Sequence, residues 1–516
     1  MSVLAIDAGT TGVTALIVTD EGTIAGRGYQ EFRQYFPQPG WVEHLPEGIW
    51  QATLAASAQA LTSAGAPAIA SVGITNQRET AVIWDRATLG APHRAIVWQD
   101  RRTTAICERL RASGAEPRVA ELTGLRIDPY FTATKLTWLA ENEPAVWSGV
   151  EDGSLIVGTV DAYLVARLSG GRLHVTDASN ASRTLLFDIE AGQWSSELCS
   201  LFGVPPHALP EVVASTGVVG HTEPSVFLGL SVPIAGMAGD QQAALFGQAC
   251  FEPGAAKCTY GTGSFVLVNT GSQVVRSQAG LLSTVAWLEP SGALTYALEG
   301  SVFVTGAAIQ WLRDGLGLLD NAGQSEALAR SVDDSGGVVF VPALTGLGAP
   351  DWDPDARGAM FGLTRGTTRA HLIRAALEAI AFEVRDVVDV MTAEAEARLG
   401  VSGGADAGPG GADGGADAGP GFGGLALRVD GGASLNNLLM QLQADQIQRP
   451  VERPVVAETT ALGAAFLAGL ATGVWSSREE LAAIWRLDRR FTPGAPDDTS
   501  HARWRSAVEQ TKGWAR

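Results

Sequence analysis

The chain has 516 residues, of which 46% are hydrophobic and 7% aromatic, enough for about two to four domains with sizeable cores. Its 36 Lys and Arg against 55 Asp and Glu give a formal net charge of −19, which disfavours nucleic acid as a partner. No apolar run is long enough to span a membrane, and the four cysteines lack metal or redox spacing, so we expect a cytoplasmic protein with reduced thiols and no membrane insertion.

The N-terminal residues predict a β-meander. Its three strands are expected at residues 3–7, 13–19 and 23–32. The first turn, AGTTG, can direct backbone N–H groups and the hydroxyls of Thr10 and Thr11 at phosphate oxygens, with Gly12 closing the turn. Asp7 at the tip of the strand can hold Mg²⁺ through water. An ordinary glycine-rich hairpin is an equally good interpretation of this string alone.

Arg78 and Glu79 follow a predicted strand at 70–75, in the string GITNQRET. Adjacent opposite charges are most often on a solvated surface, but a ligand with several hydroxyls would use both, since Glu accepts and Arg donates hydrogen bonds. Trp98, Tyr130 and Phe265 are either core residues or the wall of a site for a carbon chain.

Asp240 lies in AGDQQ, between an apolar strand and a helix expected at 241–250. It is either a helix N-cap or, next to a phosphate site, a general base. Strand, Gly-Thr-Gly turn and strand then recur at 256–269 around Thr262. The repeat predicts a duplicated architecture, which we divide into domains 1–250 and 251–516.

Helical patterns alternate with the strands and define an α/β fold. Further helices are expected at 49–64, 103–112, 306–315, 369–399, 434–446 and 460–471. Residues 401–424 are rich in Gly, Ala and Asp and predict a disordered surface insertion.

Several long strings together make the chain resemble the glycerol kinases of the FGGY carbohydrate kinase family. They are PGWVEHLPEGIW (39–50), GITNQRET (73–80), AIVWQDRRT (95–103), HVTDASNASRTLLFD (174–188), AGDQQAALFGQ (238–248), TYGTGSF (259–265), TGLGAPDWDPDARGAMFGLTRG (345–366) and RVDGGASLNN (428–437). The resemblance implies two actin-like (ribonuclease H-like) domains, with mixed sheets flanked by helices, around an ATP cleft. It also implies ATP-dependent phosphorylation of glycerol to sn-glycerol 3-phosphate, with Mg²⁺, and a homo-oligomer, dimer or tetramer.

The resemblance assigns roles position by position. Asp240 matches the catalytic base, and Asp7 and Asp240 match metal-associated acids. The positions that match polyol-binding residues are Arg78, Glu79, Trp98, Tyr130, Asp240, Gln241 and Phe265. The positions assigned to the nucleotide are Thr10, Thr11, Gly12, Thr14, Thr262, Gly306, Gln310, Gly432 and Asn436.

Two features depart from the family pattern. Thr14 stands where glycerol kinases commonly carry an arginine, and HTEPSVFLGLS lacks the glycine-rich basic loop that binds fructose bisphosphate in some relatives. A kinase for another small polyol or a ketose, and a weakly active ATP-binding sensor, are the alternatives to a glycerol kinase.

Overall fold

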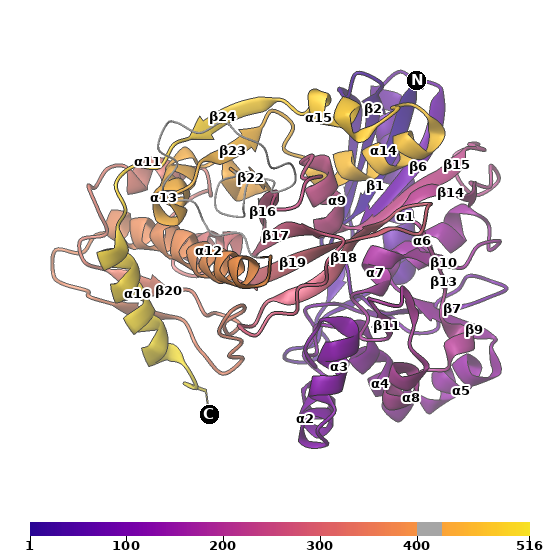
Figure 1. Cartoon of the computed structure of the whole chain (residues 1–516), viewed down its shortest axis with the longest axis horizontal. Helices are drawn as coiled ribbons and strands as arrows, with labels where there is room; N and C mark the ends of the chain where they lie inside the picture. Colours follow the sequence, from indigo (N-terminus) through magenta and orange to yellow (C-terminus); the bar gives the residue numbers. More distant parts are fainter. Residues whose placement is uncertain (400–425, 516) are drawn as a thin grey trace, which may run out of the picture.

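The computed structural model describes residues 1–399 and 426–515, and two β-sheets with helices on their faces dominate it (Figure 1). The insertion predicted at 401–424 lies outside the described residues. Within the described ranges, no helix is both long and apolar enough to cross a membrane. Cys107, Cys199, Cys250 and Cys258 are all buried and unpaired.

The first sheet has the strand order β14-β15-β6-β1-β2-β3. Its strands are β1 (Ser2–Ala8), β2 (Gly12–Thr19), β3 (Ile24–Glu31), β6 (Ile69–Asn76), β14 (Thr216–His221) and β15 (Pro233–Gly239). β1, β6 and β15 are parallel, whereas β1-β2-β3 form the antiparallel meander predicted from the sequence.

The second sheet repeats this plan in the order β18-β19-β17-β16-β22-β23-β24. Its strands are β16 (Ala256–Tyr260), β17 (Ser264–Gly271), β18 (Leu282–Leu288), β19 (Leu294–Val302), β22 (Leu427–Asp430), β23 (Val451–Pro454) and β24 (Leu487–Phe491). β16, β22 and β23 are parallel, as β1, β6 and β15 are in the first sheet, and β16-β17 is an antiparallel hairpin like β1-β2. The predicted duplication is confirmed.

Short strands pair outside the two large sheets. They are β4 (Gln34–Tyr35), β5 (Glu43–His44), β7 (Val82–Asp85), β8 (Ala95–Ile96), β9 (Leu155–Gly158), β10 (Val175–Asp177), β11 (Phe187–Asp188), β12 (Gln193–Trp194), β13 (Glu211–Val213), β20 (Val339–Val341) and β21 (Ala359–Phe361).

The helices divide between the two halves of the chain. In the first half they are α1 (Pro46–Ser63), α2 (Thr104–Ala112), α3 (Glu116–Thr123), α4 (Thr132–Asn142), α5 (Pro144–Asp152), α6 (Val160–Leu168), α7 (Ala178–Ala181), α8 (Ser196–Phe202), η1 (Pro206–Ala208) and α9 (Asp240–Gly247). In the second half they are α10 (Gly306–Asp314), α11 (Gln324–Ala329), α12 (Arg369–Leu399), η2 (Gly432–Leu435), α13 (Asn437–Ile447), α14 (Thr459–Thr472), α15 (Arg478–Ile484) and α16 (Asp498–Thr511).

One helix prediction is wrong in detail. The helix expected at 434–446 is divided into η2 and α13, because the side chain of Asn436 accepts a hydrogen bond from the backbone N–H of Leu439 and starts a new helix.

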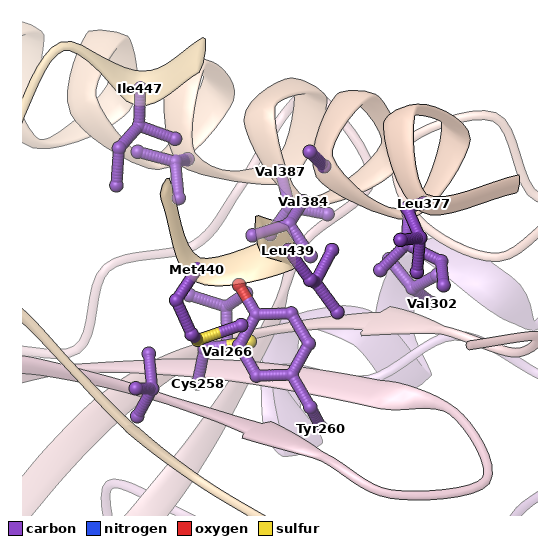
Figure 2. Close-up of a cluster of buried hydrophobic side chains, with 14 of the residues drawn as sticks. Cys258, Tyr260, Val266, Val302, Leu377, Val384, Val387, Leu439, Met440 and Ile447 are labelled. Carbon is purple, nitrogen blue, oxygen red and sulfur yellow. The ribbon is translucent and has the colours of Figure 1, made fainter. Parts of the chain in front are cut away.

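The two sheets and their helices form successive layers. Leu4 and Ile6 of β1 face the core shared with α1 and α6, whereas Val3 and Ala5 face the core shared with α9 and α14. That second core also contains Leu267 of the second sheet, so α9 and α14 pack between the sheets. The opposite face of the second sheet packs against α12 and α13, where the ring of Tyr260 rises from β16 toward Leu439 and Met440 (Figure 2).

The backbone of α14 lies directly against the backbones of the first sheet and of α9. This helix comes from the second half of the sequence, and ten of its residues are buried. A Cβ atom at Gly463 would lie 1.8 Å from the carbonyl oxygen of Ala243 in α9, and one at Gly73 in β6 would lie 2.1 Å from the carbonyl oxygen of Ala464. Glycine is therefore required at both positions for the layers to meet.

We predict that Gly463→Ala lowers the Tm, because the added methyl group forces α9 and α14 apart; overpacking of this kind costs about 1–3 kcal/mol. Gly366→Ala is the control, since its Cβ would meet no atom closer than 3.7 Å. Thermal unfolding of both variants checks the prediction, and a Tm of Gly463→Ala equal to that of the control would contradict it.

Candidate active site

The first group of candidate residues lies at one edge of the first sheet. β1, β6 and β15 are parallel, so their carboxyl ends meet there; Asp7 pairs with Thr75, and Gly239 pairs with Asn76. Arg78 follows β6 and Asp240 follows β15. Ligands of open α/β sheets bind at this edge, and the topology therefore brings together three side chains from distant parts of the sequence.

Arg78 is the centre of a buried ion network. Its Nη1 donates to Glu299 Oε2 at 2.5 Å and its Nη2 donates to Glu299 Oε1 at 3.1 Å, while Nε lies 3.1 Å from Asp240 Oδ1. Arg183 donates to Glu79 at 2.7 Å and to Glu299 at 2.8 Å. Arg78 and Glu79 are 2% and 1% exposed, so the surface interpretation of this pair is wrong.

Burial and the neighbouring arginines shift the pKa values of Glu299 and Glu79 in opposite directions. For Glu299, burial opposes ionisation, but Arg183 and Arg78 outweigh it and lower the pKa to about 2. For Glu79, burial has the larger effect and raises the pKa, although Arg78 and Arg183 oppose the shift. Glu79 also has a positive φ of 61°, which turns the chain sharply after Arg78.

α7 holds the two arginine segments together. Asn76 and Asn180 exchange two amide hydrogen bonds of 3.0 and 3.1 Å, which tie the end of β6 to α7. Asp177 caps α7 by accepting from the N–H groups of Ser179 and Asn180. Arg183 follows this helix directly and is therefore fixed relative to Arg78.

Asp240 is a partly exposed acid at the edge of the sheet. It is the first residue of α9 rather than its N-cap, which is Gly239, and its side chain is 29% exposed while that of Arg78 is 2% exposed. One carboxylate oxygen contacts Arg78, so the group is oriented by a buried cation and remains open to a ligand. The following Gln241 accepts a hydrogen bond of 2.5 Å from the buried Lys257.

Three aromatic side chains line the space beside Arg78. The centroid of the Trp98 ring lies 5.7 Å from that of Tyr130 and 6.4 Å from that of Phe265. Tyr130 is buried, whereas Trp98 and Phe265 are partly exposed, as walls of a site would be. Lys135 donates to the carbonyls of residues 129–131 and so fixes the loop that carries Tyr130.

The predicted phosphate turn lies next to these aromatic residues. The indole N–H of Trp98 donates to Thr10 Oγ1 at 2.9 Å, and Thr11 is exposed at the tip of the turn while Gly12 is buried at the start of β2. Thr14 is paired across the antiparallel strands with Asp7, so their side chains share one face of the sheet.

Asp7 has the electrostatics of a cation site. Burial, and then the charge of Asp240, raise the pKa of Asp7 to about 7. Two facing acids of this kind attract a divalent cation, although within the described residues no group of three or more His, Cys, Asp or Glu is placed to hold a metal.

A second group of candidates surrounds a cavity of about 490 Å³ at the corresponding edge of the second sheet. It is lined by five of the predicted nucleotide residues: Thr262, Gly306, Gln310, Gly432 and Asn436. A Cβ atom at Gly432 would meet nothing within 4 Å, so the backbone there is open to a flat ligand. Asn436 Oδ1 accepts the hydrogen bond that caps α13. The amide nitrogen of Asn436 donates to Ser325 Oγ and is the side-chain atom that can also donate to a ligand.

Three buried charged residues of the site were not predicted from the sequence: Arg183, Glu299 and Lys257. Each is fully buried and contacts a predicted site residue. The sequence pattern that could have identified them is a charged residue inside an apolar strand, as for Glu299 in LTYALEGSV. Such a residue is rarely buried unless it is paired with an opposite charge.

Comparison with known proteins covers nearly the whole chain. The model of the FGGY family of carbohydrate kinases matches with its N-terminal domain at residues 2–247 and with its C-terminal domain at residues 256–472. The chain is 52% identical to glycerol kinase from Symbiobacterium thermophilum and 49% identical to glycerol kinase 2 from Thermotoga maritima, in each case over 99% of both chains.

Solved structures agree in fold. The crystal structure of Plasmodium falciparum glycerol kinase with ADP is 34% identical, with a TM-score of 0.85 over 99% of this chain and 98% of that one. A gluconate kinase from Lactobacillus acidophilus shares the fold at 20% identity, with a TM-score of 0.81 over 99% of this chain and 96% of that one.

We predict that Asp7→Asn stabilises the ligand-free protein above neutral pH. The pKa of Asp7 is about 7 in the folded chain and 3.8 ordinarily, so folding favours the protonated acid. The cost of ionising Asp7 is therefore absent below about pH 4 and complete above about pH 7, where it reaches a few kcal/mol. Asparagine removes that cost.

Melting curves of wild type and Asp7→Asn at pH 5 and pH 8 check this prediction, with the larger gain in Tm expected at pH 8. Asp20→Asn is the control, because Asp20 lies at the other end of the β1-β2 hairpin and a hydrogen bond with the N-terminal ammonium lowers its pKa. A gain for Asp7→Asn that is equal at the two pH values would be evidence against the raised pKa.

Proposed function

The chain belongs to the FGGY family of carbohydrate kinases, and we propose that it transfers the γ-phosphoryl group of ATP to a terminal hydroxyl of glycerol. The product is sn-glycerol 3-phosphate. The observation that carries the proposal is the carboxylate of Asp240, which is oriented by Arg78 and open to a ligand beside a glycine-threonine turn. Full-length identity of about 50% to glycerol kinases supports the choice of substrate.

The polyol site has donors and acceptors for adjacent hydroxyls. Arg78 donates, Glu79 accepts, and Tyr130 and Gln241 provide a hydroxyl and an amide. Trp98 and Phe265 meet edge to face, with ring centroids 6.4 Å apart, and together provide an apolar wall for a short carbon chain. An apolar wall beside paired polar groups suits a three-carbon polyol better than a longer ketose.

Asp240 serves as the general base. It accepts the proton of the terminal hydroxyl as that oxygen forms a bond to the γ-phosphorus, while the bond from the γ-phosphorus to the β–γ bridging oxygen breaks and ADP leaves. Thr10, Thr11 and the backbone N–H groups of both glycine-threonine turns donate to the phosphate oxygens.

The cavity of the second sheet suits the adenosine part of ATP. We expect adenine to pack against the backbone at Gly432 and to accept a hydrogen bond from the amide of Asn436, with Gln310 and Gly306 along the same cavity. Thr262 is the middle residue of the β16-β17 turn, whose N–H groups would be directed toward the phosphates. In this proposal the adenosine binds to the second half of the chain and the polyol to the first.

Mg²⁺ fits the acids of the first sheet. Asp7 and Asp240 would hold the ion together with water and ATP oxygens, and burial, followed by the charge of Asp240, raises the pKa of Asp7 to about 7. When bound, Mg²⁺ neutralises charge on the phosphate oxygens.

We further place the boundary of the two domains at residue 250, just after α9 and before β16. We propose a cytoplasmic location, because four buried and unpaired cysteines suit a reducing compartment, and we propose the homo-oligomer implied by the family.

Asp240→Asn should retain ATP binding and lose turnover by about 10²- to 10⁴-fold, because an amide does not accept the hydroxyl proton. ADP release measured with glycerol, erythritol and xylulose checks both the base and the substrate. Asp152→Asn, at the exposed C-terminal end of α5, is the control. Turnover of Asp240→Asn within threefold of wild type would refute the base, and faster turnover with xylulose would refute the substrate.

Thr14→Arg should raise kcat/KM for ATP, because it adds a cation on the strand face that carries Asp7. An arginine at a transferring phosphoryl group contributes up to about 10³-fold elsewhere, but we expect far less from a site shaped for threonine. Steady-state kinetics of Thr14→Arg and Thr14→Ala at saturating glycerol test this prediction. If both substitutions lower activity, the threonine hydroxyl itself binds phosphate.

A further inference from the structure

Glu299 is a buried acid that the proposed reaction does not use. It lies on β19 of the second sheet and is 0% exposed, yet its strongest contacts are with Arg78 and Arg183 of the first half of the chain. An isolated buried carboxylate would be costly, so its presence requires both arginines.

Both oxygens of Glu299 are occupied by the arginines. Oε2 accepts from Arg78 Nη1 at 2.5 Å, and Oε1 accepts from Arg78 Nη2 at 3.1 Å and from Arg183 Nη2 at 2.8 Å. Ser301, two residues further along β19, donates to the same Oε1 at 3.3 Å. This two-oxygen fork fixes the plane of the Arg78 guanidinium as well as its position.

Arg78 has other acceptors toward which it would turn without this fork. Its Nε is 3.1 Å from Asp240 and 3.9 Å from Glu79, and Nη2 is 3.4 Å from the hydroxyl of Tyr130. Asp240, Glu79 and Tyr130 belong to the proposed polyol site, whereas Gln242, whose Oε1 accepts from Nη1 at 3.2 Å, does not. A guanidinium released from Glu299 would therefore rotate into the groups that should bind substrate.

We infer that Glu299 is the positioning residue of the polyol site, holding Arg78 so that its donors face the substrate hydroxyls; this inference rests on the proposed function. Glu299 belongs to the second half of the chain, and Arg78, the substrate-binding residue that it positions, belongs to the first half. The polyol site is accordingly complete only when the two halves are docked, even though its direct ligands come almost entirely from one of them.

Two substitutions separate charge from geometry. Glu299→Gln keeps the shape of the side chain and removes its charge. Glu299→Asp keeps the charge and moves the carboxylate away from the arginines by the length of one methylene group. Glu289→Gln is the matched control, because Glu289 also accepts from an arginine, Arg478 at 2.5 Å, but lies at the end of β18 away from the site. The readouts are kcat and the separate KM values for glycerol and ATP.

For both Glu299 variants we expect the KM for glycerol to rise on the order of 10- to 100-fold, with the KM for ATP within about twofold of wild type. A partly unfolded enzyme lowers kcat through the active fraction and leaves KM unchanged, so the KM split is specific to positioning. If Glu299→Gln does not fold, Glu299→Asp, which retains the charge, carries the test.

An unchanged KM for glycerol in Glu299→Asp would overturn the inference, and so would a parallel rise in both KM values. These results are distinct from failure of the proposed function, in which the wild type itself releases no ADP in response to glycerol and the inference falls with it. Normal kinetics of Glu289→Gln establish that loss of an arginine partner elsewhere on the sheet has no such effect.

Discussion

The active-site edge depends on the mutual neutralisation of buried charges. Arg78, Arg183, Glu79 and Glu299 are all withdrawn from water and find their counter-charges in one another. Removing one member of such a set leaves an unpaired buried charge, which costs about 3–5 kcal/mol. The segments that carry them, after β6, after α7 and on β19, are therefore fixed to one another. The partly exposed Asp240 is oriented by its contact with Arg78 of this network.

The duplicated sheets supply two similar edges with different chemistry. In both, a glycine-threonine turn follows the first of three parallel strands, so backbone N–H groups are presented at corresponding places. The first edge adds ionisable side chains and aromatic walls. The second adds a cavity with glycine at its surface, which accommodates a flat group rather than a reacting one. The two sheets share one arrangement of strands, and the chemistry of their two edges differs because their residues differ.

Local patterns sufficed for the β1-β2-β3 meander, for the β16-β17 hairpin, for seven of the sixteen α-helices of the described residues and for the duplication, because strand alternation and glycine turns are set by neighbouring residues. Asp7, Arg78 and Asp240 were recognisable because each stands in a distinctive string at the end of a strand. The roles of Glu299 and Lys257 were not, since a buried charge is meaningful only with its partner, and those partners are 221 and 16 residues away. The break before Asn436 was missed because a side-chain cap, not periodicity, decides it.

The position of α14 has a consequence for synthesis of the chain. Val3 and Ala5, which are synthesised long before this helix, face a core that includes its residues Ala464 and Ala465. Translation must therefore proceed from β1 through α14 (Thr459–Thr472) before that face of the first sheet is fully covered. During this interval a nascent chain exposes an apolar sheet surface, the kind of surface that chaperones bind.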